Sequence, residues 1–314
     1  KIKVMRNSEE RYISLLTDFG FKRVFGTVLN KDLLIDFLNS LFDGEQVVKD
    51  VTFLNSEHVG DVRSERKAIF DVYCENEQGE KFIVEMQNAY QTFFKDRSLY
   101  YATFPIREQA EKGDVWDYQL KHVYVVALLN YKMSDSAFSP DTINHDIGLL
   151  DKQTHRVFND KLTFKYVEIS KFDKCLEELE SNYDKWLYVL RNLSRLDSQP
   201  DYLRNEIFNR LFSEAEIAHF SKVELREYED SLKAYRDIKN SLDTAKAEGL
   251  AEGFGKGRVE GHAEGRAEGL VEGRAEGRAE TLVEVAKNLL SIGTPIESIM
   301  KATGMTEDEI KDLA

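Results

Sequence analysis

The chain has 314 residues, and its 43 Lys and Arg against 57 Asp and Glu give a formal net charge of −14. Hydrophobic residues make up 42% of the sequence and aromatic residues 11%, which is enough for a real core and excludes a wholly disordered chain. A sequence pI near 5.1 disfavours a protein whose whole surface binds nucleic acid, although a local basic patch stays compatible with it.

Targeting signals and metal-thiolate patterns are absent from the sequence. It has no apolar run of about 18 residues or more and no basic stretch leading into an apolar one, so we expect no membrane association and a cytoplasmic location. The two cysteines, Cys74 and Cys175, are far apart and form no CxxC motif. The sequence therefore predicts neither a disulfide framework nor a zinc-thiolate site, and we expect both cysteines to be reduced and buried.

Hydrophobic periodicity predicts an α/β arrangement in the first half of the chain. Residues 31–42 place leucine and phenylalanine at helical spacing, which is typical of an amphipathic helix. Four later segments are short, rich in β-branched and aromatic residues and bounded by turns, and are expected to be strands: 50–54, 67–75, 81–87 and 122–130. Between the last two lies 93–112, a predicted helix that is interrupted or kinked at Pro105. The expected order is helix, three strands, helix, strand.

The second half of the chain is expected to be mainly helical. Two further candidate strands, 153–158 and 163–170, lead into it. From about 171 to 245 the pattern is helical, with Pro200 as the one hard break. We therefore expect an α/β domain over residues 1–170 and a helical region over 171–245.

A glycine repeat occupies residues 246–280. Glycine recurs at every fourth position from Gly249 to Gly277, usually as Ala-Glu-Gly-x. Each glycine costs roughly 1 kcal/mol relative to alanine inside a helix, so the intrinsic helix propensity is poor. In a helix the glycines would form a stripe that drifts only about 40° per repeat, along which a second helix could pack closely. We favour a helix that joins subunits into a homo-oligomer over the alternative, a flexible solvated linker.

Residues 281–314 predict a small helical C-terminal element of two or three short helices. Thr294 and Thr306 are the expected N-caps, with Pro295 in the first turn. A helix-turn-helix also suggests DNA binding, but acidic residues outnumber basic ones over 294–314, which a phosphate backbone disfavours. A protein-docking or capping element is the favoured interpretation.

The most informative segment is the hairpin around Glu77, Gln78 and Gly79. A three-residue loop with Gly79 in the left-handed conformation pairs Asn76 with Glu80. A two-residue loop would shift the register by one and divide the apolar residues between the two faces. The three-residue loop instead makes one face wholly apolar, with Phe70, Val72 and Cys74 opposite Met86, Val84 and Phe82.

The other face of this hairpin carries the candidate chemistry. The register places Asp71 opposite Glu85, where Cβ atoms are about 4.5–5.5 Å apart and like charges destabilise, so the pair needs a cation. Two carboxylates without histidine or cysteine suit Mg²⁺ or Mn²⁺ rather than zinc. Gln87 lies on the same face, and its amide can orient a water or a phosphate oxygen. The alternative is an exposed hairpin face whose acidic pair is neutralised by a Lys or Arg from elsewhere.

These residues carry a resemblance to a known family. The Asp71 and Glu85-Met86-Gln87 pattern, the motif TDFGFKRVFG at 17–26, the segment DRSLYY at 96–101 and the glycine repeats resemble the recombination-promoting nuclease / putative transposase family of the PD-(D/E)XK nuclease superfamily. The resemblance covers about residues 12–245. It implies an α/β fold with a restriction-endonuclease-like core in αβββαβ order, followed by a helical region and a Gly-repeat helical tail.

The resemblance implies a metal-dependent DNA endonuclease, with recombination, mobile-element movement and phage defence as possible contexts. Asp71 and Glu85 would bind Mg²⁺ (or Mn²⁺ or Ca²⁺), and Gln87 stands where the superfamily usually has lysine. The charge-stabilising group is therefore unassigned: Lys81 shares the face but lies at the other end of its strand, and Lys22 would have to approach from another element. The alternative function is a catalytically inactive nuclease fold that acts as an oligomeric binding or scaffold protein.

Three further residues are weaker candidates. Asp18 is either a third acidic ligand or the N-cap of a helix that begins near Phe19, and the cap is favoured. Lys95 and Arg97, on the helix after the strand of Glu85, either contact DNA phosphates or solvate the outer face of that helix. No histidine lies in a metal-binding pattern, and no phosphate-binding loop is present.

Overall fold

A computed structural model describes residues 10–58, 68–110, 117–135 and 137–313. The chain divides into two compact units, Lys1–Leu242 and Asp243–Ala314, and the boundary falls inside helix α6 (Lys222–Ser291). Each unit has a hydrophobic core of its own. In the described part of the chain, no helix has both the length and the apolar composition needed to cross a membrane.

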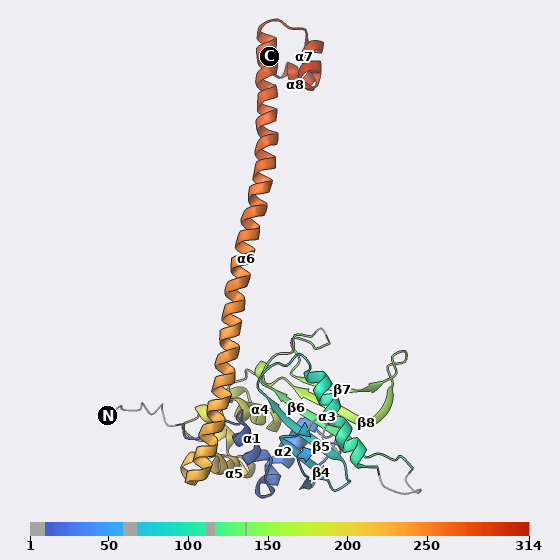
Figure 1. Ribbon diagram of the computed structural model, residues 1–314, viewed down its shortest axis with the longest axis vertical. Coiled ribbons are helices and arrows are strands. Elements are labelled where there is room, and N and C mark those ends of the chain that lie inside the picture. Colours follow the sequence, from blue (N-terminus) through green and yellow to red (C-terminus); the bar gives the residue numbers. More distant parts are fainter. Residues whose placement is uncertain (1–9, 59–67, 111–116, 136, 314) are drawn as a thin grey trace, which may run out of the picture. The chain divides into compact units, whose positions relative to one another are not determined.

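A six-stranded mixed sheet forms the centre of the first unit (Figure 1). Across the sheet the strands follow the order β1 (Val51–Phe53), β4 (Val72–Asn76), β5 (Lys81–Gln87), β6 (Val123–Leu129), β8 (Val157–Val167) and β7 (Asn144–Leu150). Strand β4 is antiparallel to its two neighbours, β1 and β5, whereas β5, β6 and β8 run parallel and β7 is antiparallel to β8. A separate two-stranded sheet pairs β2 (Glu57–His58) with β3 (Ala68–Ile69).

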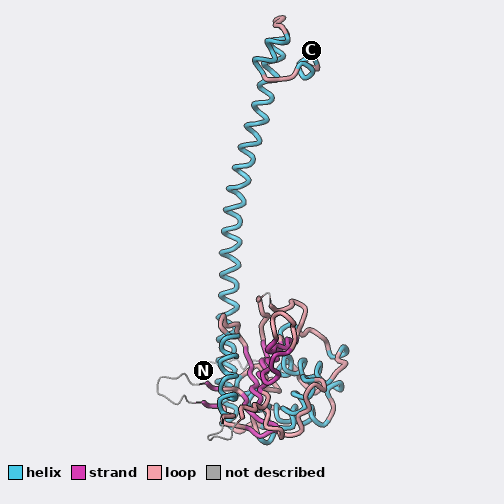
Figure 2. The backbone as a smooth tube through the Cα atoms, turned by 90° about the vertical axis from the view of Figure 1, so that its right-hand side faces the viewer, coloured by secondary structure: helices cyan, strands magenta, loops and turns pink. Residues whose placement is uncertain are grey.

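Helices cover both faces of the six-stranded sheet, as Figures 1 and 2 show together. Helix α3 (Phe94–Glu108) connects β5 to the parallel strand β6 and packs on one face. The other face carries α1 (Asp18–Phe25), α2 (Lys31–Phe42), α4 (Asn182–Asn192) and α5 (Glu206–Ala215). Because side chains alternate along a strand, β5 supplies Ile83 to the core under α3 and Val84 to the opposite core.

Short 3-10 helices complete the first unit, and a small helical cluster forms in the second. The 3-10 helices are η1 (Val28–Asn30), η2 (Ile169–Lys171), η3 (Leu176–Glu178), η4 (Leu193–Arg195), η5 (Asp201–Leu203) and η6 (Ile217–His219). In the second unit, α7 (Ile296–Thr303) and α8 (Glu307–Lys311) pack against the end of α6 through Ala286, Ile299 and Ile310.

Most of the expected elements of the α/β region occur. The helix predicted over 31–42 is α2 with the same bounds, and the strands predicted at 50–54, 81–87 and 122–130 are β1, β5 and β6. The prediction of a mixed α/β fold is therefore confirmed. Of the interruption or kink expected at Pro105, the interruption is wrong, because this proline lies in the last turn of α3 and the helix continues to Glu108.

Other expectations need correction. The strand expected over 67–75 is divided into β3 and β4, and this break moves Phe70 into the core under α3 instead of the opposite core that holds Val72 and Cys74. Strand β7 is not predicted by the sequence, and one strand, β8, replaces the two expected at 153–158 and 163–170. Cys74 is buried as expected, but Cys175 is exposed.

The predicted helix caps are partly confirmed. Thr306 caps α8, since its side chain accepts the N–H of Glu309. Pro295 itself is the N-cap residue of α7, so Thr294 lies one residue before the cap. The glycine repeat lies within α6.

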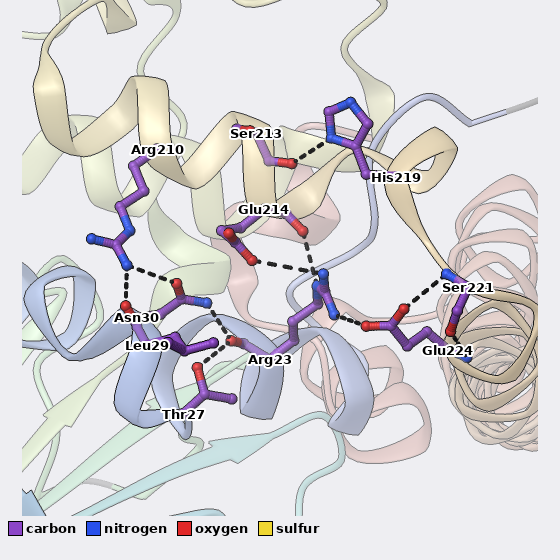
Figure 3. Close-up of polar contacts among 10 residues, drawn as sticks. All are labelled: Arg23, Thr27, Leu29, Asn30, Arg210, Ser213, Glu214, His219, Ser221 and Glu224. Carbon is purple, nitrogen blue, oxygen red and sulfur yellow. Dashed lines mark hydrogen bonds and ion pairs between the residues drawn. The ribbon is translucent and has the colours of Figure 1, made fainter.

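Arg23 ties α1 to the helical region of the first unit (Figure 3). Its Nε donates to the backbone oxygen of Glu214 at 2.9 Å, and its Nη1 donates to Oε1 of Glu224 at 2.6 Å. The guanidinium carbon lies 4.3 Å from the ring centroid of Phe220. Glu224 also accepts the backbone N–H of Ser221, and these bonds together lower its pKa to about 2. One side chain thus connects α1, α5 and the start of α6.

Two backbone donors near α1 are satisfied by α6. The N–H of Phe19, in the first turn of α1, donates to Oγ of Ser231 at 3.1 Å. The N–H of Ser14 donates to the hydroxyl of Tyr228 at 3.0 Å, and this tyrosine is buried. Since first-turn N–H groups have no partner within their own helix, α6 supplies an acceptor that α1 needs.

Replacing Arg23 with alanine should lower the free energy of unfolding by about 1–3 kcal/mol, because partly buried acceptors on α5 and α6 lose their donor. Urea denaturation followed by circular dichroism would measure the change. Arg204→Ala is the matched control, since Arg204 pairs with Asp201 in solvent and should contribute little. Equal effects of the two substitutions would show that Arg23 does not hold these helices together.

Candidate active site

The hairpin of β4 and β5 has the register predicted from its loop. Val72 pairs with Val84 and Glu75 with Lys81. Gly79 has φ +77°, and the N–H of Asn76 donates to the oxygen of Glu80 at 3.0 Å. Glycine adopts this left-handed conformation without steric cost, so the loop chemistry fixes which side chains face each other.

Asp71 and Glu85 lie where this hairpin ends. Asp71 comes directly before β4, and its Oδ2 accepts the N–H of Met86 at 2.8 Å. In return, Oε1 of Glu85 accepts the N–H of Asp71 at 3.3 Å. Each carboxylate therefore takes a backbone hydrogen bond from the opposite strand, which holds the two side chains next to each other.

Glu85 is buried, and Asp71 is partly buried. The exposed fraction of Glu85 is 6%, and burial, followed by repulsion from Asp71, raises its pKa to about 8. Burial also raises the pKa of Asp71, against the opposing effects of the Met86 N–H and the Lys22 charge. The exposed face of the alternative interpretation is therefore wrong, whereas its neutralising Lys or Arg agrees with the charges of Lys22 and Arg97 beside this pair. The two groups resist simultaneous ionisation until positive charge is supplied.

Two cations from different helices act on this pair. Lys22 on α1 and Arg97 on α3 both favour the ionised forms of Asp71 and Glu85. Burial opposes the charge on Lys22, but its hydrogen bond to Asp18 and the fields of the three carboxylates outweigh burial and raise its pKa. The positive charge that the sequence analysis leaves unassigned is thus supplied by side chains on two helices, α1 and α3.

The remaining basic candidates are engaged elsewhere. Lys81 forms an ion pair with Glu75, on the part of the hairpin near the turn. Lys95, two residues before Arg97 in α3, forms an ion pair with Asp135.

Asp18 does not cap α1, so the favoured interpretation of this residue is wrong. Thr17 is the N-cap, and its hydroxyl oxygen accepts the N–H of Gly20 at 3.1 Å. Asp18 is the first helical residue, and its Oδ1 lies 2.8 Å from the ammonium of Lys22. Its charge contributes to raising the pKa of Asp71, so it belongs to the charged surroundings of the pair.

Gln87 connects the acidic pair to Arg97. Its Nε2 donates to Oε2 of Glu85 at 3.1 Å, and its Oε1 accepts a hydrogen bond from Nη2 of Arg97. Because Arg97 can only donate, the amide oxygen must face Arg97 and the NH₂ group must face Glu85. The second N–H of the amide remains for a water or a phosphate oxygen.

Sequence reasoning missed Asn88, which positions α1 beside the hairpin. Its Nδ2 donates to the backbone oxygen of Leu16 at 2.6 Å, and its Oδ1 accepts from Asn130 at 3.3 Å. The bond from Asn88 to Leu16 ties the segment before α1 to the end of β5 and so places Lys22 near the carboxylates. The only sequence signal is a polar residue directly after Gln87, which is too weak to identify such a contact.

The donor set fits a hard divalent cation that keeps part of its water. Within the described ranges, no three His, Cys, Asp or Glu side chains gather into an all-protein metal site. Mg²⁺ does not need one, because it is usually bound by one or two carboxylates with waters and substrate phosphates as the other ligands. Asp71 and Glu85 meet this requirement, and their raised pKa values mark a place where a cation would be stabilising.

The raised pKa of Glu85 predicts a pH-dependent stability in metal-free buffer. The folded state binds a proton more tightly than the unfolded state, where the ordinary pKa is 4.5, so stability should fall as pH rises from about 4.5 to about 8. The loss should be on the order of a few kcal/mol, since one pKa unit corresponds to about 1.4 kcal/mol. Thermal melts with EDTA from pH 5 to 9 would measure it. Glu85→Gln should flatten this dependence, and an equally steep fall in that variant would contradict the assignment.

Comparisons with known proteins agree with this geometry. The family described as PD-(D/E)XK nuclease family transposase matches residues 15–245. No curated protein and no solved structure matches the chain. The match supports a nuclease or transposase-like role with DNA as the substrate, and a fold of the PD-(D/E)XK kind around the mixed sheet. Since the match covers well over half of the sequence, the chain belongs to the PD-(D/E)XK nuclease family transposases.

Proposed function

We propose that this protein is a divalent-metal-dependent endonuclease that hydrolyses phosphodiester bonds in DNA. The observation that carries the proposal is the pair of Asp71, which is partly buried, and Glu85, which is buried, joined to Gln87 and flanked by Lys22 and Arg97. Burying two facing carboxylates is unfavourable for folding, and a cation-dependent reaction gives a reason to keep them.

Asp71 and Glu85 are the residues that would hold the cation. When bound, Mg²⁺, or Mn²⁺ or Ca²⁺ in its place, would lower the pKa of a water and neutralise charge on the scissile phosphate. Gln87 positions a water or a phosphate oxygen through its second amide N–H, and Arg97 keeps that amide in its orientation.

Lys22 and Arg97 would together supply the charge of the lysine that this chain lacks at position 87. The ammonium of Lys22 has three donors and uses one on Asp18, so it can also donate to a phosphate oxygen. Arg97 is held by Gln87 and by Oε1 of Gln91 at 2.6 Å, which limits its movement. A phosphate between these two cations would gain electrostatic stabilisation without a lysine on β5.

We also propose that the glycine repeat joins copies of this chain. A Cβ added to any repeat glycine from Gly249 to Gly277 would meet no atom within 4 Å, so nothing described in the chain packs on this stripe. Phe254 and Val271 on the same segment are exposed. Close packing of an equivalent helix from a second copy along this stripe would offset the low helix propensity of glycine.

Asp71→Asn and Glu85→Gln should each reduce DNA cleavage at least about 100-fold, because either change removes a cation ligand. Plasmid nicking with Mg²⁺, Mn²⁺ or Ca²⁺, and with an EDTA control, would measure the loss. Glu75→Gln is the matched control: it removes a carboxylate from the same hairpin that pairs with Lys81 instead, and should keep most of the activity. If wild-type protein cuts no DNA with any of the three metals, the inactive scaffold becomes the better explanation.

Replacing Gly261, Gly265 and Gly269 with leucine should reduce the mass of the assembly, although leucine raises intrinsic helix propensity. The bulkier side chains would prevent close approach of two backbones. Multi-angle light scattering would measure the mass, with Glu260, Glu264 and Glu268 changed to alanine as a control one position away along the helix. A monomeric wild type, or an unchanged mass in the triple leucine variant, would favour the flexible linker.

A further inference from the structure

An open hollow lies on the first half of α3, next to the proposed active site. Its volume is about 720 Å³, which falls in the range of small-molecule binding sites. It is lined by Gln91, Thr92, Phe93, Asp96, Arg97, Tyr100 and Tyr101. Three of these seven residues are aromatic: Phe93, Tyr100 and Tyr101, of which Tyr101 also packs against the core under α3.

Large aromatic surfaces in this hollow face solvent. The exposed fraction is 72% for Phe93 and 43% for Tyr100. Leaving such rings in water forgoes the stabilisation that burial of apolar surface would give. Exposed apolar groups gathered in a hollow are typical of a surface that binds a ligand or another macromolecule.

Two of the three aromatic rings, those of Tyr100 and Tyr101, pack on other rings of the unit. Tyr100 packs edge-to-face on Phe104 at 5.1 Å between ring centroids, and Tyr101 packs edge-to-face on Phe70 at 5.2 Å. The backbone oxygen of Phe93 accepts the N–H of Arg97 at 2.9 Å, which fixes the start of α3. A flat ligand would meet rings whose positions are already set by the fold.

Arg97 belongs both to this hollow and to the proposed active site. Its Nη2 donates to Gln87, which bonds Glu85, while its Nη1 donates to Gln91 on the wall of the hollow. One guanidinium group thus spans the distance between the two. A nucleotide whose phosphate lies at the acidic pair would have its own or the adjacent base within reach of the hollow.

The chemistry of the walls favours a base over a phosphate. Asp96 would repel a phosphate, whereas a carboxylate can accept a hydrogen bond from an amino group on a base edge. Gln91 keeps its NH₂ group as a donor, because its oxygen already accepts from Arg97. Aromatic rings provide stacking for any base, since every base has a π-face.

We propose that this hollow binds an unpaired nucleobase of the DNA strand that the active site cuts, by stacking on Phe93 and Tyr100. The proposal rests on the proposed function, because the DNA strand is brought to the hollow by the nuclease site. The base comes either from single-stranded DNA or from a duplex out of which one nucleotide has been rotated.

The test uses full-length protein carrying Asp71→Asn, so that the DNA is bound and not cut. Oligonucleotides with 2-aminopurine at successive positions report stacking, because the fluorescence of this base is quenched when it stacks on an aromatic ring. Phe93→Ala and Tyr100→Ala should each weaken binding of a single-stranded oligonucleotide about 5-fold to 150-fold and abolish quenching at one position. Phe93→Trp should retain quenching, which shows that the loss in Phe93→Ala comes from the missing ring.

Leu99→Ala is the matched control. Leu99 lies on the same helix with an exposed fraction of 52%, but it does not line the hollow, so affinity and quenching should stay unchanged. Fully paired and singly mismatched duplexes identify the source of the base: quenching in the paired duplex indicates a rotated nucleotide, and quenching only with mismatched or single-stranded DNA indicates a strand that is already open. Phe93→Ala and Tyr100→Ala variants that behave like Leu99→Ala would overturn the base site.

This result is separable from that of the nuclease assay. If Phe93→Ala and Tyr100→Ala variants of the otherwise wild-type protein cut DNA as well as the wild type, the proposed endonuclease is retained and the base site is rejected. If the protein shows position-specific quenching but cuts DNA with none of the three metals, the base site is retained and the proposed endonuclease is rejected.

Discussion

Two carboxyl groups, Asp71 and Glu85, must share a buried position at the end of one hairpin, and much of the first unit is arranged around that constraint. Ionising both of them in a site withdrawn from water is unfavourable, as the raised pKa values of both groups indicate. Hydrogen bonds from the Met86 and Asp71 backbone offset part of this cost, but they do not remove the repulsion. The site therefore depends on cations brought to it by other elements.

Those cations come from opposite sides of the sheet. Helix α3 packs on the face that carries Glu85 and presents Arg97, while α1 packs with the opposite core and presents Lys22 at the end of the hairpin. A lysine at position 87 would have brought its charge on the strand itself. With Gln87 in that place, the charge of the site depends on how two separate helices are packed.

The hairpin could be predicted from sequence because its determinants are local. The turn needs a residue with positive φ, which Gly79 provides, and the alternation of apolar side chains permits one register. The pairing of Asp71 with Glu85 therefore follows from about twenty residues. The face assigned to Phe70 is wrong because the strand breaks next to Asp71, and no turn residue in the sequence marks that break. Where two adjacent residues can both cap a helix, as Thr17 and Asp18 can, local reasoning also lacks a basis for choosing.

Long-range contacts could not be predicted in the same way. Lys22 reaches the site because Asn88 bonds the backbone of Leu16, a contact between residues 72 positions apart. Arg97 reaches Gln87 because of where α3 begins after β5, which depends on the packing of Phe94 and Tyr101 as much as on helix propensity. Strand β7 is hidden for a different reason: most of its side chains are exposed, so its sequence lacks the apolar alternation that identifies a strand.

The helical residues after the sheet lie within the family match, which extends to residue 245, and they help to hold the helix that carries Lys22. The start of α6 accepts a first-turn N–H of α1 through Ser231 and binds Arg23 through Glu224. Lys22 precedes Arg23 directly in α1, so any shift of this helix relative to α6 would also move the ammonium group that faces the carboxylates. Without the bonds from α6, the sheet and α3 would retain Asp71, Glu85, Gln87 and Arg97, but the helix that carries Lys22 would lose part of its support. If Lys22 supplies part of the charge of a lysine at position 87, as we propose, the helical region contributes to the complete site.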